Sequence, residues 1–194
     1  YSFNKKEHLK HSATNIIKKY FWNIDPFLKL CKGNADHIIG INTTIKKVLN
    51  LADEKLTVLP AVACEKGLNE ATMKNKDTFT IISIGRFVPL KGFDLCLKSF
   101  AKFYHNLNQE SRSKVKLQLI GKGPQLYFLK NLAKKLDIKN AVEFIAWMDR
   151  VQLKEKYQSS HLFLFPSHEG AGMVVPEALS FGLPCVVLDN WGPG

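Results

Sequence analysis

Apolar and polar residues follow two different periods along residues 79–188. Short apolar runs of strand length, rich in β-branched and aromatic residues, lie at residues 79–84, 115–120, 142–145, 162–165 and 185–188. Between them, apolar residues recur every three or four positions and predict helices over residues 92–106, 125–136, 151–158 and 174–181. Strands that alternate with helices form parallel sheets covered on both faces. We therefore expect an α/β fold with a Rossmann-like parallel sheet and helices on both faces.

The first 60 residues have a less regular pattern. Residues 4–21 predict an amphipathic helix with a basic outer face, which favours a helix docked on a domain core over a membrane-surface helix. Short strands are expected at residues 36–41 and 55–63, with a short helix between them at residues 44–51.

A polar segment at residues 65–77 predicts a linker or long loop. The chain is therefore expected to have two parts, residues 1–60 and 61–194. It starts without Met and stops where a further helix would be expected, so we expect it to be a piece of a longer protein.

Charge and cysteine content narrow the function classes. A formal net charge of +11 favours an anionic partner: nucleic acid, an acidic membrane surface or a phosphorylated ligand. No aromatic and basic residues interleave as in nucleic-acid-binding motifs, so that class is disfavoured. No apolar run reaches the length of a membrane span, and we expect a soluble, cytoplasmic protein. The four cysteines are scattered without zinc-ligand spacing, which predicts reduced thiols and no metal.

Ligands of open parallel sheets bind beyond the carboxyl ends of the strands, so the loops after the strands are the candidate sites. The first loop holds Gly85 and Arg86, with Lys91 a few residues further on. Arg86 and Lys91 could converge on one anion such as a diphosphate. The alternative is that Lys91 is a solvated residue, but a cation at a helix start opposes the helix dipole and favours an anionic ligand.

The loop after the fourth strand, "PSHEGAG", ends in small residues. A helix is expected directly after it, and the first N–H groups of a helix attract anions or hydroxyl oxygens. Glu169 and Glu177 flank its end, and a wholly helical path would place their Cα atoms about 12 Å apart. That is wide for a glycosidase pair. Carboxylates accept hydrogen bonds from vicinal hydroxyls, and a nucleotide sugar carries diols at both ends. The alternative, a helix-terminal charge and a solvated helix residue, stays open on spacing alone. No GxGxxG opens the first helix, which disfavours NAD.

Several segments resemble one enzyme family. "SIGRFVPLKGFD", "LIGKGP", "FIAWM" and "FPSHEGAGMVVPEALSFGLPCVV" are similar, in order, to the donor-binding domain of retaining, metal-independent glycosyltransferases of the GT-B fold, most closely family 4. The last motif is the most specific. The resemblance makes residues 61–194 a nucleotide-sugar-binding domain truncated at its C-terminus, and residues 1–60 the end of an acceptor domain with the interdomain linker.

The resemblance also implies a role for each matching residue. Arg86 and Lys91 would hold the diphosphate and stabilise the leaving nucleoside diphosphate, while Glu177 would bind the ribose. Glu169 would face the transferred sugar together with the following backbone amides. Those amides belong to Gly170, Ala171, Gly172 and Met173. Trp147 and Met148 would lie near the base, and Gly85, Gly121 and Gly123 would line the cleft.

The resemblance implies no cofactor or metal, a UDP- or GDP-sugar as co-substrate, and a glycan or lipid-linked acceptor in polysaccharide or glycolipid biosynthesis. Peripheral contact with the cytoplasmic membrane face is a further expectation, and the chain alone is expected to transfer little sugar. Two other interpretations stay open: a sugar-nucleotide epimerase or phosphorylase of the same architecture, and a non-catalytic domain that binds nucleic acid or another anion.

Overall fold

The computed structural model describes residues 25–40, 43–59, 74, 77–168 and 173–188. The chain divides into two compact units, residues 1–61 and 62–194. The amphipathic helix expected at residues 4–21 and the polar linker expected at residues 65–77 fall largely on residues outside the described ranges.

The first unit contains a small parallel sheet of β1 (Ile38–Gly40) and β2 (Leu56–Val58). Helix α3 (Thr44–Leu49) and the 3₁₀ turn η1 (Asp53–Lys55) connect the strands, and α2 (Pro26–Asn34) precedes them. The sequence pattern had indicated both strands and α3, but not α2. The start of α2 has a clear local cause, because Asp25 accepts the Phe27 N–H at 2.9 Å and Pro26 occupies the first helical position.

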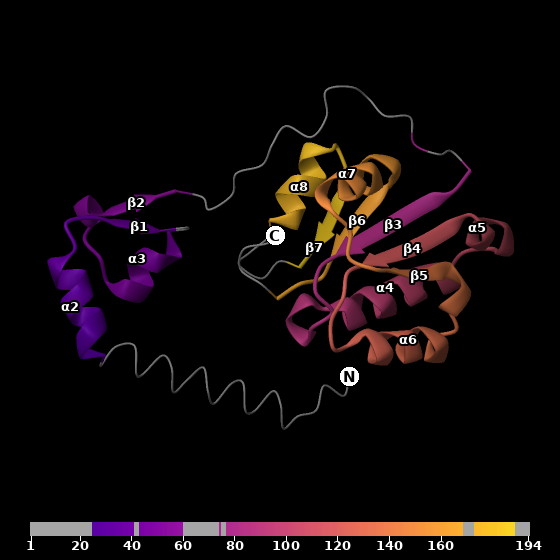
Figure 1. The fold of residues 1–194 in the computed structure, drawn as a ribbon, viewed down its shortest axis with the longest axis horizontal. Coiled ribbons are helices and arrows are strands. Elements are labelled where there is room, and N and C mark those ends of the chain that lie inside the picture. Colours follow the sequence, from indigo (N-terminus) through magenta and orange to yellow (C-terminus); the bar gives the residue numbers. More distant parts are fainter. Residues whose placement is uncertain (1–24, 41–42, 60–73, 75–76, 169–172, 189–194) are drawn as a thin grey trace. The chain divides into compact units, whose positions relative to one another are not determined.

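The second unit is built on a five-stranded parallel sheet in the order β5-β4-β3-β6-β7 (Figure 1). Its strands are β3 (Phe79–Ile84), β4 (Val115–Ile120), β5 (Val142–Ile145), β6 (Leu162–Phe165) and β7 (Cys185–Val187). These bounds match the five predicted apolar runs, except that β7 ends one residue early. The expected α/β parallel sheet is confirmed.

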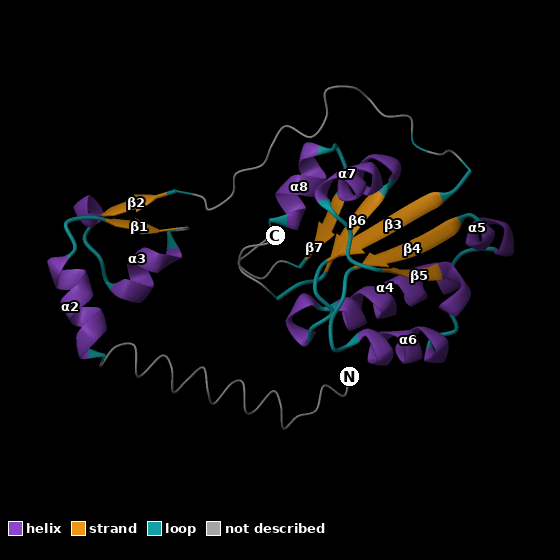
Figure 2. Ribbon diagram, in the orientation of Figure 1, coloured by secondary structure: helices purple, strands orange, loops and turns teal. Residues whose placement is uncertain are grey.

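Helices cover both faces of this sheet (Figure 2). They are α4 (Phe93–His105), α5 (Gln109–Ser113), α6 (Leu126–Lys135), α7 (Arg150–Ser159) and α8 (Val174–Ser180), with 3₁₀ turns η2 (Pro89–Lys91) and η3 (Lys139–Ala141). All except α5 and the 3₁₀ turns were predicted from periodicity, to within a residue or two.

Two hydrophobic cores lie on opposite faces of the sheet, because successive strand residues point to opposite sides. Ile81, Leu117 and Leu119 pack with the buried stripes of α4 and α6. Ile82, Ile84 and Ile120 pack with residues of α7 and α8. The sheet is therefore buried on both sides, as expected for an all-parallel sheet, and only the loops at the strand ends are left for a ligand.

Candidate functional site

The strand order identifies one end of the sheet as the candidate site. The chain runs outward from β3 to β4 and β5, and then returns to place β6 on the other side of β3. The order therefore reverses between β3 and β6. Open α/β sheets bind their ligands at the carboxyl ends of the strands beside such a reversal. Gly85 and Arg86 directly follow β3, and residues 166–173 follow β6.

The loops after β3 and β6 are in direct contact. The His168 N–H donates to the Leu90 carbonyl at 2.9 Å, and the buried Ser167 hydroxyl lies 3.4 Å from the same oxygen. Gly92 adopts a left-handed φ of 67°, and a Cβ there would lie 1.9 Å from the Pro166 carbonyl oxygen. Only glycine allows this approach, so the stretch that carries Lys91 is fixed against the loop that leads to Glu169.

The loops after β3 and β4 are joined in the same way. A Cβ on Gly121 would lie 1.9 Å from the Gly85 carbonyl oxygen. The Phe87 N–H donates to the Lys122 carbonyl at 2.9 Å, and the Gln125 N–H donates to the Phe87 carbonyl at 3.0 Å. Gly121 and Gly123 thus pack loop against loop at the predicted cleft, and their contact with a ligand remains a prediction.

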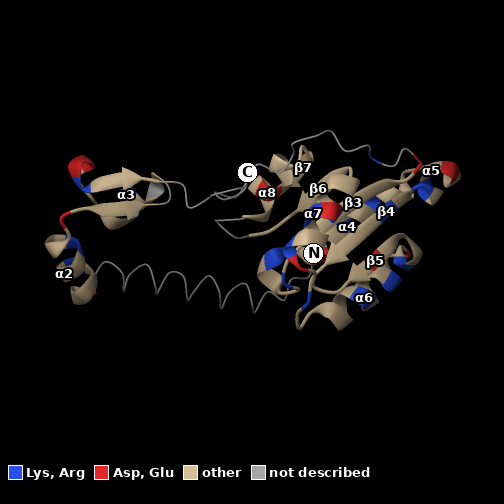
Figure 3. Ribbon diagram, turned by 45° about the horizontal axis from the view of Figure 1, so that its top comes forward, with Lys and Arg blue, Asp and Glu red and all other residues tan. Residues whose placement is uncertain are grey.

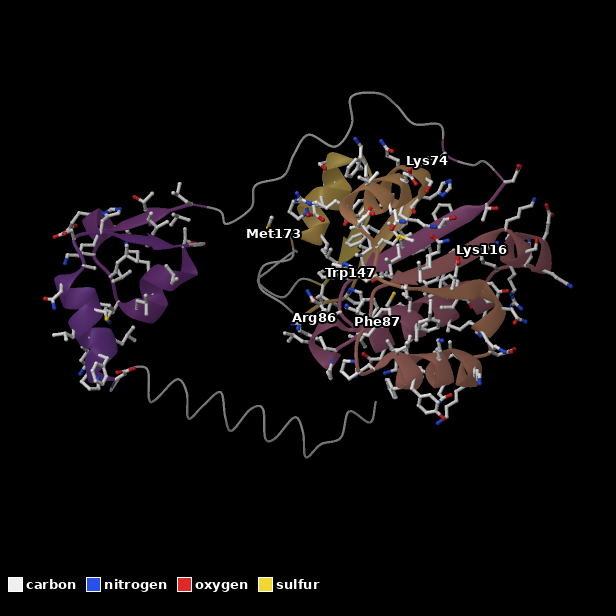
Figure 4. The ribbon with its side chains drawn as sticks, in the orientation of Figure 1. Lys74, Arg86, Phe87, Lys116, Trp147 and Met173 are labelled. Atoms are coloured by element: carbon white, nitrogen blue, oxygen red, sulfur yellow. The ribbon has the colours of Figure 1, made fainter. Side chains whose placement is uncertain are left out.

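Lys91 lies where the ends of β3 and β6 meet. Its Cδ would be 3.7 Å from a Cβ on Gly85, and its Nζ lies 5.4 Å from the centroid of the Phe165 ring. Phe165 is the last residue of β6 and is fully buried. Arg86 is exposed on the same edge of the domain (Figure 4). Arg86 and Lys91 thus both lie in the segment that follows β3, and their convergence on one anion stays a prediction.

Glu177 lies in the first turn of α8 and is half-buried. The Tyr157 hydroxyl donates to Glu177 Oε2 at 3.3 Å. The sequence left open a solvated helix residue as the alternative for Glu177. The structure shows a half-buried carboxylate with one buried phenol as hydrogen-bond donor, and its ribose-binding role stays a prediction.

The remaining predicted site residues are only partly described. Trp147 is 58% exposed in the loop after β5, and Met148 packs against the core formed with α7 and α8. Met173 directly precedes α8 and is 37% exposed. Figure 4 shows Arg86, Trp147 and Met173 toward the carboxyl ends of the strands, with Lys116 toward their amino ends. Glu169, Gly170, Ala171 and Gly172 lie outside the described residues.

Cys96 and Cys185 do not form a reactive site. Burial raises the pKa of the Cys96 thiol to about 12; a hydrogen bond with Ser83 lowers it and the Asp94 charge adds to the rise. Burial likewise raises the pKa of Cys185 to about 11. Both thiols are protonated at neutral pH, which leaves no thiolate nucleophile at either position.

Metal-ligand clusters and membrane-spanning helices are both absent from the described residues. Among the described residues, no group of three or more His, Cys, Asp or Glu side chains could hold a metal ion. Within the same ranges, every helix is too short or too polar to cross a membrane.

Sequence reasoning missed two side chains of this region, Phe165 beneath Lys91 and Tyr157 beside Glu177. Phe165 had been assigned only to a buried strand, and Tyr157 to a predicted helix. Their position at the end of a strand and within a helical stripe marks them as core residues. Nothing in the local sequence indicates which charged group each would meet.

Comparison with known proteins assigns the family. The profile described as "Glycosyl transferases group 1" matches residues 66–194. An uncharacterized glycosyltransferase of Haemophilus influenzae is 41% identical over 128 residues, which cover 64% of this chain and 32% of that protein.

Solved structures agree on the fold. WaaG, a glycosyltransferase involved in lipopolysaccharide biosynthesis, superposes with a TM-score of 0.66 at 18% identity, covering 80% of this chain and 45% of that one. The pneumococcal O-GlcNAc transferase GtfA, solved with UDP and GlcNAc, gives a TM-score of 0.64 at 18% identity, covering 79% and 30%. The chain spans less than half the length of the curated relatives it matches. By its sequence profile, and in agreement with the fold of its GT-B structural neighbours, the chain belongs to the group 1 glycosyl transferases.

Proposed function

We propose that the chain carries the donor site of a retaining, metal-independent glycosyltransferase that uses a nucleotide diphosphate sugar, with a UDP- or GDP-sugar as the expected donor. The observation that carries the proposal is the position of Lys91 and Arg86 at the strand reversal between β3 and β6. Ligands of such sheets bind at that point, and the two cations suit a diphosphate. Family membership supports the reaction class.

In the proposed reaction the bond between the anomeric carbon and the diphosphate oxygen breaks, and an acceptor hydroxyl oxygen bonds to the anomeric carbon from the same face. The hydroxyl proton passes to the departing diphosphate oxygen. Negative charge develops on the leaving nucleoside diphosphate. Arg86 and Lys91 would stabilise that charge, and fixed cations of this kind supply the stabilisation that a divalent metal gives in other enzymes. The retained configuration follows from the family resemblance.

The other donor contacts are assigned by the same proposal. Glu177 would accept hydrogen bonds from the ribose hydroxyls, and Glu169 with the amides of residues 170–173 would face the transferred sugar. Trp147 and Met148 would lie near the base. Gly85, Gly121 and Gly123 would line the cleft between the loops.

The acceptor and the location are also part of the proposal. We expect a glycan or lipid-linked acceptor in polysaccharide or glycolipid biosynthesis, and a cytoplasmic protein that contacts the membrane face peripherally. The formal net charge of +11 supports an anionic surface or ligand as partner. Figure 3 shows Lys and Arg distributed over several elements of the second unit rather than gathered on one helix.

The proposal is tested by nucleotide binding to the 194-residue chain. Melting temperatures are measured with UDP, GDP, ADP, CMP, UDP-sugars and GDP-sugars, with and without EDTA. A ligand that binds only the folded state raises the melting temperature, so one nucleoside diphosphate should give a rise that EDTA does not remove. A rise that EDTA abolishes would contradict metal independence.

Charge-matched variants then locate the binding site. Arg86→Ala and Lys91→Ala should each weaken binding of that nucleoside diphosphate about tenfold or more, because hydrogen bonds to charged groups contribute about 1.5 to 3 kcal/mol. Lys116→Ala is the control, since it removes the same charge from an exposed position at the amino end of β4. Titration calorimetry that finds equal losses in all three variants would reject a local diphosphate site in favour of general electrostatics. Donor consumption without acceptor would instead favour the epimerase or phosphorylase interpretation.

A further inference from the structure

The Tyr157 side chain lies along one side of α8. Its ring stacks on Phe181, with centroids 5.4 Å apart and planes 9° apart, and its hydroxyl donates to Glu177 at 3.3 Å. Glu177 and Phe181 are four residues apart, which places them on one helix face. The ring therefore lies against the end of α8, and the hydroxyl reaches one turn back toward its start. That start follows the carboxyl end of β6, where the donor site is proposed.

The ring has little freedom to move. Tyr157 is 2% exposed, and its centroid lies 6.1 Å from that of the fully buried Phe163. A phenol held in this way presents its hydroxyl at a fixed point. By contrast, a glutamate in the first turn of a helix can adopt several rotamers, and ordering it for a ligand costs free energy. The fixed Tyr157 hydroxyl, as a hydrogen-bond donor to Glu177, restricts the orientations of the carboxylate before any ligand binds.

We propose that Tyr157 is a positioning residue for the ribose-binding carboxylate of Glu177. The inference rests on the proposed function, because Glu177 is given its role there. A carboxylate has about four acceptor sites, so one hydrogen bond from Tyr157 to Oε2 leaves capacity for a vicinal diol. Tyr157 would not touch the ligand. It would act by holding the Glu177 carboxylate in the orientation that a ribose diol requires.

The test compares Tyr157→Phe with the unchanged chain. This substitution removes one oxygen and keeps the buried ring, so the packing against Phe181 is retained. Calorimetry is carried out with UDP, GDP, 2′,3′-dideoxy-UDP and inorganic pyrophosphate. For the ribonucleoside diphosphate that binds, Tyr157→Phe should weaken affinity about 3- to 10-fold, the usual range for one hydrogen bond. Affinities for pyrophosphate and the dideoxy analogue should not change, because neither has the diol.

Two further variants separate positioning from a structural role. Tyr104→Phe removes a phenol from α4 in the other core and should leave all affinities unchanged. In a Glu177→Gln background, Tyr157→Phe should cause little additional loss, since the two residues act on the same group. An equal loss for UDP and pyrophosphate, or a full additional loss in the Glu177→Gln background, overturns the inference.

The outcome for the unchanged chain separates the two proposals. If it binds neither ribonucleoside diphosphate, the proposed function fails and this inference fails with it. If it prefers a ribonucleoside diphosphate over the dideoxy analogue and Tyr157→Phe keeps that preference unchanged, only the inference is rejected.

Discussion

Lys91 can be attracted both by a buried ring and by an anionic ligand. Its Nζ lies 5.4 Å from the centroid of Phe165, a distance at which cation–π attraction is significant. The ring thus accounts for part of the placement of a cation beside the start of α4, where the helix dipole disfavours it. The two attractions are compatible, because the ring contacts one side of the ammonium group and its N–H donors can also point elsewhere. In the proposed donor site, Phe165 would then hold the Lys91 charge in place for a diphosphate.

This view predicts that Phe165→Leu weakens pyrophosphate and nucleoside diphosphate binding equally, about 2- to 5-fold, as expected for loss of a cation–π contribution of about 0.5 to 1 kcal/mol. The control is Phe163→Leu, which removes the neighbouring, equally buried ring of β6 on the same face of the sheet. Calorimetry measures the affinities of both variants for pyrophosphate and the nucleoside diphosphate. Equal weakening by the two substitutions would assign the effect to general packing of β6.

Helix α7 connects the predicted base-binding loop to the proposed ribose site. It begins directly after Trp147 and Met148 and carries Tyr157 near its other end. Its start is fixed by a capping box. Asp149 Oδ1 accepts the Gln152 N–H at 2.9 Å, and the Gln152 side chain accepts the Asp149 N–H at 3.3 Å. The exposed surface of α7 is strongly polar, so local capping is a substantial part of what defines its first turn.

Asp149→Ala should therefore lower the free energy of unfolding by about 1 kcal/mol, the usual effect of losing an N-cap side chain. Lys154→Ala, at an exposed position of the same helix, should change it by less than about 0.5 kcal/mol. Urea unfolding of the two variants measures the difference. A similar effect of both substitutions would mean that packing rather than capping defines the start of α7.

The elements differ in how far the sequence could predict them. The five strands of the second unit are buried on both faces, so each gives a continuous apolar run that is easy to recognise. Helix α5 is five residues long and polar, so it has no apolar period, and only Asn108, which caps it, marks its start. Helix α2 was missed for another reason: it contains apolar residues such as Phe27 and Leu30, but they are exposed and form no buried stripe.

The candidate site could be predicted only in part. The positions of Arg86, Lys91 and Glu177 after the carboxyl ends of two strands follow from the strand pattern, because parallel strands end at one edge of the sheet. The pairs Lys91–Phe165 and Tyr157–Glu177 join segments 74 and 20 residues apart in sequence. Which residues form these pairs depends on strand order and helix packing, and the local sequence pattern predicts neither.

The molecule consists of two units, and its thiols report on them separately. Cys31 is exposed in α2 of the first unit, whereas Cys96 is fully buried in α4 of the second. The family profile matches residues 66–194, almost the whole second unit.

Burial raises the pKa of Cys96 from 9.0 to about 12, so its protonated form stabilises the fold fully below pH 9 and this contribution is lost as the pH rises toward 12.

Alkylation of Cys96 should consequently require opening of the second unit, while Cys31 reacts at the rate of an exposed thiol. A nucleoside diphosphate that binds the folded donor site stabilises it by about 2.7 kcal/mol at 100 times its dissociation constant. It should then slow Cys96 alkylation roughly 100-fold where global unfolding is the route, and leave Cys31 unchanged. The measurement is timed iodoacetamide labelling with peptide mass spectrometry, with UDP, GDP or neither present. Slowing of both thiols would indicate a loss of reagent rather than binding, and an unchanged Cys96 rate would mean that neither UDP nor GDP binds the folded second unit.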